Sequence, residues 1–102
     1  MVDAIRRSRS FGVTILRDNQ ESLGIRFASP HFSSAERFKD TPYEIINNCP
    51  LIKGGLAEMS CVLEHETALS ENTVFFGRVN HIEAYAGKPL IYFHRQWQRL
   101  VI

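Results

Sequence analysis

Cysteine and histidine are the side chains in this sequence best suited to metal binding, redox chemistry or nucleophilic attack. The chain carries two cysteines, Cys49 and Cys61, and four histidines, and no set of them has the close paired spacing of zinc ligands. The sequence also lacks a G-x-S-x-G elbow, a P-loop and a G-x-G-x-x-G fingerprint. Spacing alone therefore establishes no enzyme, and we interpret the cysteines as reduced, partly buried thiols of a cytoplasmic protein.

Charge is nearly balanced overall but unevenly distributed. Twelve basic and 11 acidic residues give a net charge of +1, which argues against nucleic acid as a partner. No apolar run approaches the roughly 20 residues that cross a bilayer, so we expect no membrane partner either. Residues 1–17 contain four arginines, and residues 58–71 contain four glutamates and no lysine or arginine. These are two solvated faces, or else the arginines meet a phosphate or a partner's acidic strand.

The elements that would position these side chains begin with short helices and one strand. A helix is predicted over residues 1–9, and the next seven residues alternate between apolar and small or polar types, as in a strand. Asp18 followed by Glu21 is similar to a capping box that opens a second helix. Residues 28–50 contain three prolines and an Asn-Asn pair. They are predicted to be loop, apart from one helical turn that ends near Phe38.

The rest of the chain is predicted to be strands. Residues 57–64 alternate between apolar and mostly polar types, which predicts a strand with one buried face. A second long strand is predicted over residues 73–85, with a bulge at Gly77, and two short ones over 90–93 and 97–102. The fold class is therefore mainly β, either a barrel or a strongly curved antiparallel sheet. The residues expected in its core are Phe11, Val13, Ile15, Leu23, Phe27, Ala57, Met59, Cys61, Leu63 and Leu90.

Five segments of the chain follow one another in a recognisable order. In one-letter code they are SFGVTIL at residues 10–16, CPLI at 49–52, GLAEMSC at 55–61, TVFFGRV at 73–79 and KPLIYF at 88–93. This ordered set resembles the flavin reductase-like family of FMN-binding split barrels, often the reductase components of two-component flavin monooxygenases. The resemblance implies one domain over residues 1–102, a split β-barrel with one or two short helices. It lies in the family's C-terminal two-thirds, so we expect the family's N-terminal strands to be lacking.

By the same resemblance, the reaction is hydride transfer from NADH or NADPH to FMN or FAD. The reduced flavin would then diffuse to a partner monooxygenase. Such a site needs no protein nucleophile, because the cofactors carry the chemistry and the protein positions them. The alternative is a truncated, non-catalytic remnant or protein-interaction module of the same fold. A truncated gene, a proteolysed fragment and a divergent short member all fit a chain of this length.

The site residues are assigned from the resemblance and from residue type. Family reductases commonly carry Gly-Asp-His just before the threonine of the long strand, with that histidine near the nicotinamide, whereas this chain has Ser70-Glu71-Asn72. Asn72 is therefore expected in the catalytic position, where it can form hydrogen bonds but cannot titrate near neutral pH. A flavin also needs an apolar wall and cations near its phosphate. The cofactor-binding residues expected on these grounds are Arg37, Phe38, Thr73, His94, Arg95 and Trp97.

Two of these assignments have a structural alternative. Trp97 would equally suit a core or an interface, and His94 with Arg95 would suit a polar hairpin turn. Missing strands would leave unpaired edges, at residues 11–16 or 55–67, which a monomer rarely tolerates. We therefore expect an obligate homodimer with Trp97 and residues 99–102 at or near its interface.

Overall fold

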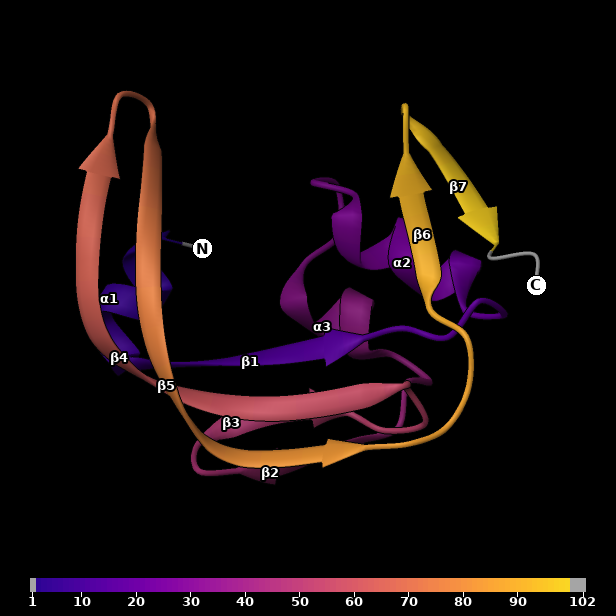
Figure 1. Ribbon diagram of the computed structural model, residues 1–102, viewed down its shortest axis with the longest axis horizontal. Helices are drawn as coiled ribbons and strands as arrows, with labels where there is room; N and C mark the ends of the chain where they lie inside the picture. Colours follow the sequence, from indigo (N-terminus) through magenta and orange to yellow (C-terminus); the bar gives the residue numbers. More distant parts are fainter. Residues whose placement is uncertain (1, 100–102) are drawn as a thin grey trace.

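The computed structural model describes residues 2–99, which form three helices and seven strands. Figure 1 shows a U-shaped arrangement in which two long strands bend upward at one end and a short hairpin rises at the other. Mainly β structure is thereby confirmed, and the described strands form an open split barrel rather than a closed one. The elements are α1 (Val2–Ser8), β1 (Ser10–Ile15), α2 (Glu21–Ala28), α3 (Ser34–Phe38), β2 (Tyr43–Ile46), β3 (Cys49–Ile52), β4 (Ala57–Leu69), β5 (Asn72–Ala84), β6 (Leu90–Phe93) and β7 (Gln96–Arg99).

The main sheet is antiparallel and has the order β1-β4-β5. The expectation that residues 55–67 form an edge is wrong for residues 57–62, which pair with β1 on one side and with β5 on the other, whereas the later residues of β4 pair with β5 alone. The two edges among the described strands are β1 and β5. Two register shifts bend the β4–β5 pair, after Ser60 and after Leu63. The second lies beside Gly77, as predicted, but the extra residue is Glu64 on β4.

The segment expected to be loop contains a hairpin. Strands β2 and β3 pair with each other, and Asn47 and Asn48 form the turn between them with φ angles of 51° and 66°. Two left-handed residues make the type of turn that matches the twist of paired strands, and asparagine tolerates this conformation. Helix α3 is the predicted helical turn, and Ser33 with Glu36 forms a capping box at its start.

The start of α2 and the end of the last strand differ from the sequence prediction. Helix α2 is present, but its N-cap is Gln20, which makes no side-chain capping bond, and not Asp18. Strands β6 and β7 form the predicted final pair, with His94 and Arg95 as the turn at φ angles of 56° and 62°. Residues 100–102, to which the last predicted strand extended, lie outside the described residues.

The core lies where the β2–β3 hairpin packs on the main sheet. Leu51 and Ser60 are fully buried there. On the other face of the sheet the predicted core residues Ala57, Cys61 and Leu63 are buried, which confirms the phase of the strand. The same prediction is wrong for Val13 and Ile15, which are 36% and 42% exposed on the edge strand β1. The half-buried members of the predicted set are Phe11, Leu23, Phe27, Met59 and Leu90.

Candidate functional site

The side chains expected to bind cofactors lie in three separate parts of the fold. Asn72 and Thr73 begin β5, where they pair with Leu69 and Ala68 at the tip of the long hairpin. Asn72 is exposed there and Thr73 is half-buried. Figure 1 shows this tip and the β6–β7 hairpin on opposite sides of the molecule. The described residues therefore do not bring all the expected contacts into one compact site.

Arg37 and Phe38 lie at the end of α3, against α2 and the start of β2. The Arg37 guanidinium donates a hydrogen bond to the Ser29 carbonyl at 2.8 Å, and its Nε is buried without an acceptor among residues 2–99. The Phe38 ring meets the edges of Phe27 and Tyr43, with both ring centroids 5.0 Å away. The three rings form a rigid apolar cluster. Arg37, the residue before Phe38, has one guanidinium N–H without an acceptor among the described residues.

His94 and Arg95 are exposed in the β6–β7 turn, and Trp97 follows on β7. The indole packs against Tyr92, its cross-strand partner, at 4.7 Å between ring centroids. It also covers Gly24 of α2, where an added Cβ would lie only 3.0 Å from the indole ring. Trp97 therefore holds the β6–β7 hairpin against α2. His94 and Arg95 form the polar turn of this hairpin.

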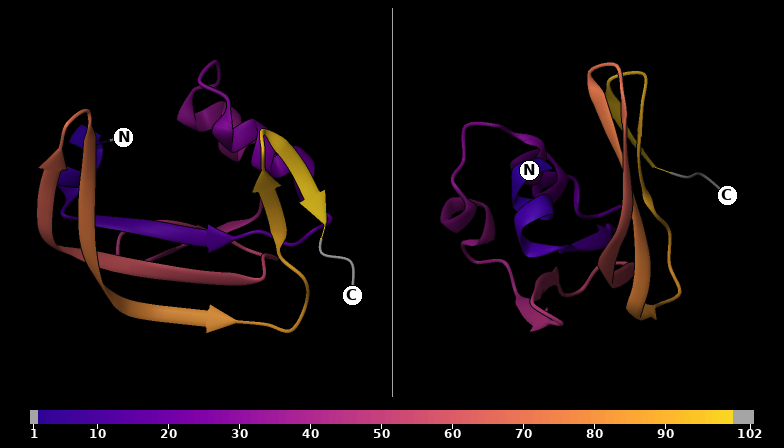
Figure 2. Two further views of the ribbon diagram at one scale, coloured as in Figure 1. Left: turned by 45° about the horizontal axis from the view of Figure 1, so that its top comes forward. Right: turned by 90° about the vertical axis from the view of Figure 1, so that its left-hand side faces the viewer.

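An apolar cleft of about 250 Å³ lies between the main sheet and the helices. Figure 2 shows α2, α3 and the β2–β3 hairpin on one side of the long strands. Phe38 is the expected contact residue that lines it, and Thr14 contributes a hydroxyl group. The cleft can hold a planar ring, while sites for whole cofactors are usually above about 300 Å³. Its lining residues are Gly12, Thr14, Leu16, Phe27, Phe38, Pro50 and Ile52.

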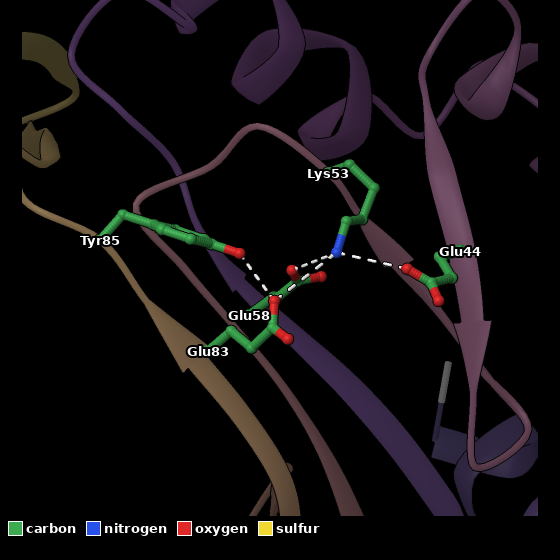
Figure 3. A network of polar contacts seen from close by, with 5 residues as sticks. All are labelled: Glu44, Lys53, Glu58, Glu83 and Tyr85. Carbon is green, nitrogen blue, oxygen red and sulfur yellow. Dashed lines mark hydrogen bonds and ion pairs between the residues drawn. The ribbon is translucent and has the colours of Figure 1, made fainter.

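A polar network beside β3 was not foreseen from the sequence (Figure 3). Lys53 Nζ lies 2.6 Å from Glu58 Oε1, 3.4 Å from Glu44 Oε2 and 3.8 Å from Glu83 Oε2. The hydrogen bond to Glu58 raises the pKa of Lys53. The Tyr85 hydroxyl donates to Glu83 at 2.7 Å, which lowers the pKa of Glu83 and raises that of Tyr85. Glu58 alternates with apolar residues and was expected on the polar face, but the hairpin covers it and leaves it 3% exposed.

A second polar cluster holds the other end of the same hairpin. The Asn47 amide donates to Ser60 Oγ at 3.3 Å and to Asn80 Oδ1 at 3.2 Å, and Ser60 also donates to Asn80. Asn80 is the extra residue at the first register shift of β5. The turn of the β2–β3 hairpin is therefore tied to the point at which the sheet bends. Together the two clusters fix the hairpin whose strand β3 forms one wall of the cleft.

Redox-active and metal-binding groups are few in the described part of the chain. Cys49 and Cys61 are both buried free thiols, and burial raises the pKa of Cys61. Among residues 2–99 no three or more metal-ligating side chains converge on one point. No helix in that range is long and apolar enough to cross a membrane. The site can thus bind, orient and exclude water, but it offers no evident nucleophile of its own.

The described residues thus form an open split barrel with a ring-sized apolar cleft against one face of its main sheet. Residues 1–100 match the flavin reductase like domain, and the chain belongs to this family. It is 32% identical over 100 residues to the NADH-dependent FMN reductase AsuE2 of Streptomyces nodosus subsp. asukaensis, covering 93% of this chain and 53% of that protein. It is 29% identical to the reductase component of a 4-nitrophenol 4-monooxygenase/4-nitrocatechol 2-monooxygenase of Rhodococcus opacus, covering 96% and 51%.

Solved structures share the fold of this chain. Flavin reductase PheA2 superposes with a TM-score of 0.87 at 28% identity, covering all of this chain and 64% of that one. The NADH:FAD oxidoreductase SgcE6 of Streptomyces globisporus C-1027 has a TM-score of 0.91 at 20% identity, covering all of this chain and 63% of that one. The chain thus spans about half the length of the curated relatives it matches.

Proposed function

We propose that this chain forms part of an NAD(P)H-dependent flavin reductase, which supplies reduced FMN or FAD to a partner monooxygenase. The observation that carries the proposal is the family match over residues 1–100, together with relatives whose names specify NADH-dependent flavin reduction. Those names favour an enzyme over a non-catalytic interaction module. A cytoplasmic location suits the proposal, because there the two free cysteines stay reduced.

The residues of the cleft fit the ring portion of a flavin. Phe27, Phe38 and Ile52 supply an apolar wall, and the cleft volume of about 250 Å³ suits a planar ring rather than a whole nucleotide. Arg37 precedes Phe38 on α3, and its buried Nε–H has no acceptor among the described residues, but Arg37 is not a lining residue of the cleft. A flavin held there would supply the acceptor for a hydride from the nicotinamide.

In this scheme the chain's own residues bind the cofactors and orient them. The cleft wall would keep water from one face of the ring, and Arg37 is assigned to the flavin by the resemblance and by its residue type. Asn72 can direct a nicotinamide amide through its side-chain donor and acceptor, but it cannot move a proton near neutral pH. Thr73 and Trp97 are assigned to cofactor binding by the resemblance, and His94 and Arg95 by their residue types, although the two hairpins that carry them lie on opposite sides of the molecule.

Fluorescence titration of FMN tests this assignment. We expect weak binding and no NADH oxidation unless flavin is added. Phe38→Ala should weaken FMN binding by about tenfold, because it removes the aromatic wall. Phe76→Ala is the matched control, since this ring is 52% exposed and does not line the cleft. If the chain neither changes FMN fluorescence nor oxidises NADH with added FMN, the result would favour the non-catalytic module. If Phe38→Ala and Phe76→Ala weaken FMN binding equally, the cleft is not the flavin site.

We also propose that the chain is a homodimer. Its accessible surface is 7485 Å², whereas a compact monomer of 11.7 kDa exposes about 5,900 Å². Part of the excess is apolar and lies on the open face of the main sheet, where Val79 and Ile82 are 45% and 57% exposed beside Val13 and Ile15. Covering such an area would give an interface of the obligate class, above about 2,000 Å² in total. Sedimentation equilibrium at micromolar concentration tests this, and a well-folded monomer would contradict it.

A further inference from the structure

The β6–β7 hairpin forms a two-stranded sheet of its own, apart from the main sheet (Figure 1). A two-stranded hairpin is marginally stable at best by itself, so its place in the fold depends on what it packs against. One attachment is at its first residue, Leu90, whose backbone N–H donates to the Leu16 carbonyl at 2.9 Å. Another is the indole of Trp97, which lies on helix α2 at Gly24.

Gly24 makes room for this indole. It is buried on α2, and an added Cβ would lie 3.0 and 3.1 Å from Cη2 and Cζ3 of Trp97 and 3.2 Å from Cδ2 of Leu90. Separations of this size are tighter than ordinary van der Waals contact. Glycine also disfavours the interior of a helix. Close packing of α2 against the hairpin is therefore the structural gain at this position.

Both attachments lead to residues that line the apolar cleft. Leu16, which accepts the hydrogen bond from Leu90, is itself a lining residue. Phe27 is another, and it follows Gly24 by three residues, which places it on the next turn along the same side of α2. Trp97 is not among the described residues that line the cleft. The hairpin thus supports the cleft without forming part of its surface.

We propose that Trp97 is a positioning residue, which acts through Gly24 to hold α2 and the Phe27 ring where they form the cleft wall. The inference rests on the proposed function, in which the cleft receives the flavin ring, and it gives Trp97 a role that needs no contact with flavin. Packing carries the effect, because the indole covers one turn of α2 and the next turn places Phe27 against Phe38, with ring centroids 5.0 Å apart.

A positioning role and direct contact with flavin have different consequences. If Trp97 acts through α2, removal of its ring loosens this helix even when flavin is absent. If Trp97 touches flavin instead, its removal weakens flavin binding and leaves the flavin-free helix unchanged. Measurements on the flavin-free chain therefore distinguish the two roles. They also distinguish failure of this inference from failure of the flavin reductase proposal.

Amide hydrogen exchange of the flavin-free chain, followed by mass spectrometry, provides the first test. In Trp97→Ala the amides of α2 should exchange at least about tenfold faster, and should be accelerated more than those of β4. Phe93→Ala is the matched control, because it removes another aromatic ring from the same hairpin. That ring is 69% exposed and lies beside His94, with centroids 5.9 Å apart, rather than on α2. Phe93→Ala should leave the exchange of α2 unchanged.

A paired substitution provides a rescue. Phenylalanine at position 97 lacks Cη2 and Cζ3, the indole atoms nearest to Gly24, and alanine at position 24 returns a methyl group to that space. Trp97→Phe alone should accelerate the exchange of α2 and raise the dissociation constant for FMN, each by about threefold. Trp97→Phe combined with Gly24→Ala should bring both quantities back to within about twofold of the parent chain.

Unchanged exchange of α2 in Trp97→Ala would overturn the proposal, and weaker FMN binding in that case would assign Trp97 to flavin contact. Equal acceleration of α2 and β4 would also overturn it, because the indole would then stabilise the whole fold rather than this helix. If Trp97→Ala fails to fold, Trp97→Phe and the paired variant decide the question. If even the parent chain binds no FMN, the exchange rates still test the positioning of α2, and the flavin proposal alone fails.

Discussion

The contact between Leu51 and Gly12 provides a sharp test of how the hairpin packs on the sheet. Leu51 is fully buried on β3, and its Cδ2 lies 2.7 Å from where a Cβ on Gly12 would be. Real Cβ atoms do not approach that closely, whereas the next neighbours, Cys49 Cβ and the Pro50 carbonyl oxygen, would be at an ordinary 3.5 Å. Leu51 is therefore the one obstacle to a side chain at position 12.

The magnitudes follow from this geometry. Leu51→Ala should cost about 3–5 kcal/mol of unfolding free energy, as expected for a fully buried leucine. Gly12→Ala alone should cost about 1–3 kcal/mol, because the new methyl group overpacks against the leucine. In the double variant the methyl group enters the vacated space, and alanine in a strand is favoured over glycine by about 0.5–1 kcal/mol. The two changes should therefore couple by about 1–3 kcal/mol in the compensating direction.

Urea unfolding followed by far-ultraviolet circular dichroism measures the four proteins of this cycle at one chain concentration. The double variant should be as stable as Leu51→Ala alone, or more stable by up to about 1 kcal/mol. Gly12→Val in the Leu51→Ala background provides a graded comparison, since its larger side chain refills more of the space that Leu51 vacates. Additivity of the two single changes within about 0.5 kcal/mol would show that Leu51 does not occupy the space above Gly12.

Three further predictions concern charge, turn and core. Lys53→Met should lower the unfolding midpoint at neutral pH, and the loss should shrink in acid as the carboxylates that need this cation become protonated. Asn48→Gly should be neutral or stabilising by a few tenths of a kcal/mol at its φ of 66°, whereas Asn47→Ala should cost about 1–2 kcal/mol because it also removes two hydrogen bonds. Leu63→Ala should cost about 2–5 kcal/mol in chemical denaturation, and a loss below about 1 kcal/mol would contradict its place in the core.

Strand periodicity was readable from the sequence because it depends only on neighbouring residues. Ala57, Cys61 and Leu63 recur at every second position and lie buried on one face, as the alternation predicts. The helical turn before Phe38 was found for a similar reason, since its capping box is a local signal. The β2–β3 hairpin was missed because three prolines outweighed the Asn-Asn pair that makes its turn. That pair was the signal that could have found it.

The residue types of the candidate site could be predicted from the sequence, but their positions in the fold could not. The ordered segments led to the right family, which the match over residues 1–100 confirms. The residues chosen from them nevertheless lie on α3, on the β4–β5 tip and on the β6–β7 hairpin. Which of these three places faces a cofactor depends on long-range packing, and no local pattern encodes it.

By itself the sequence determined most of the local elements, though not the β2–β3 hairpin, as well as the buried face of β4 and the family, because each follows from residue order or from a period of two. Only the tertiary structure decided that β4 is central, that Val13 and Ile15 stay exposed, and that Glu58 is buried beside Glu83. The physical reason is that burial of a sheet's second face depends on what crosses it. Alternation marks Glu58 as polar and outward, but a hairpin anchored by Lys53 and Asn47 covers that face.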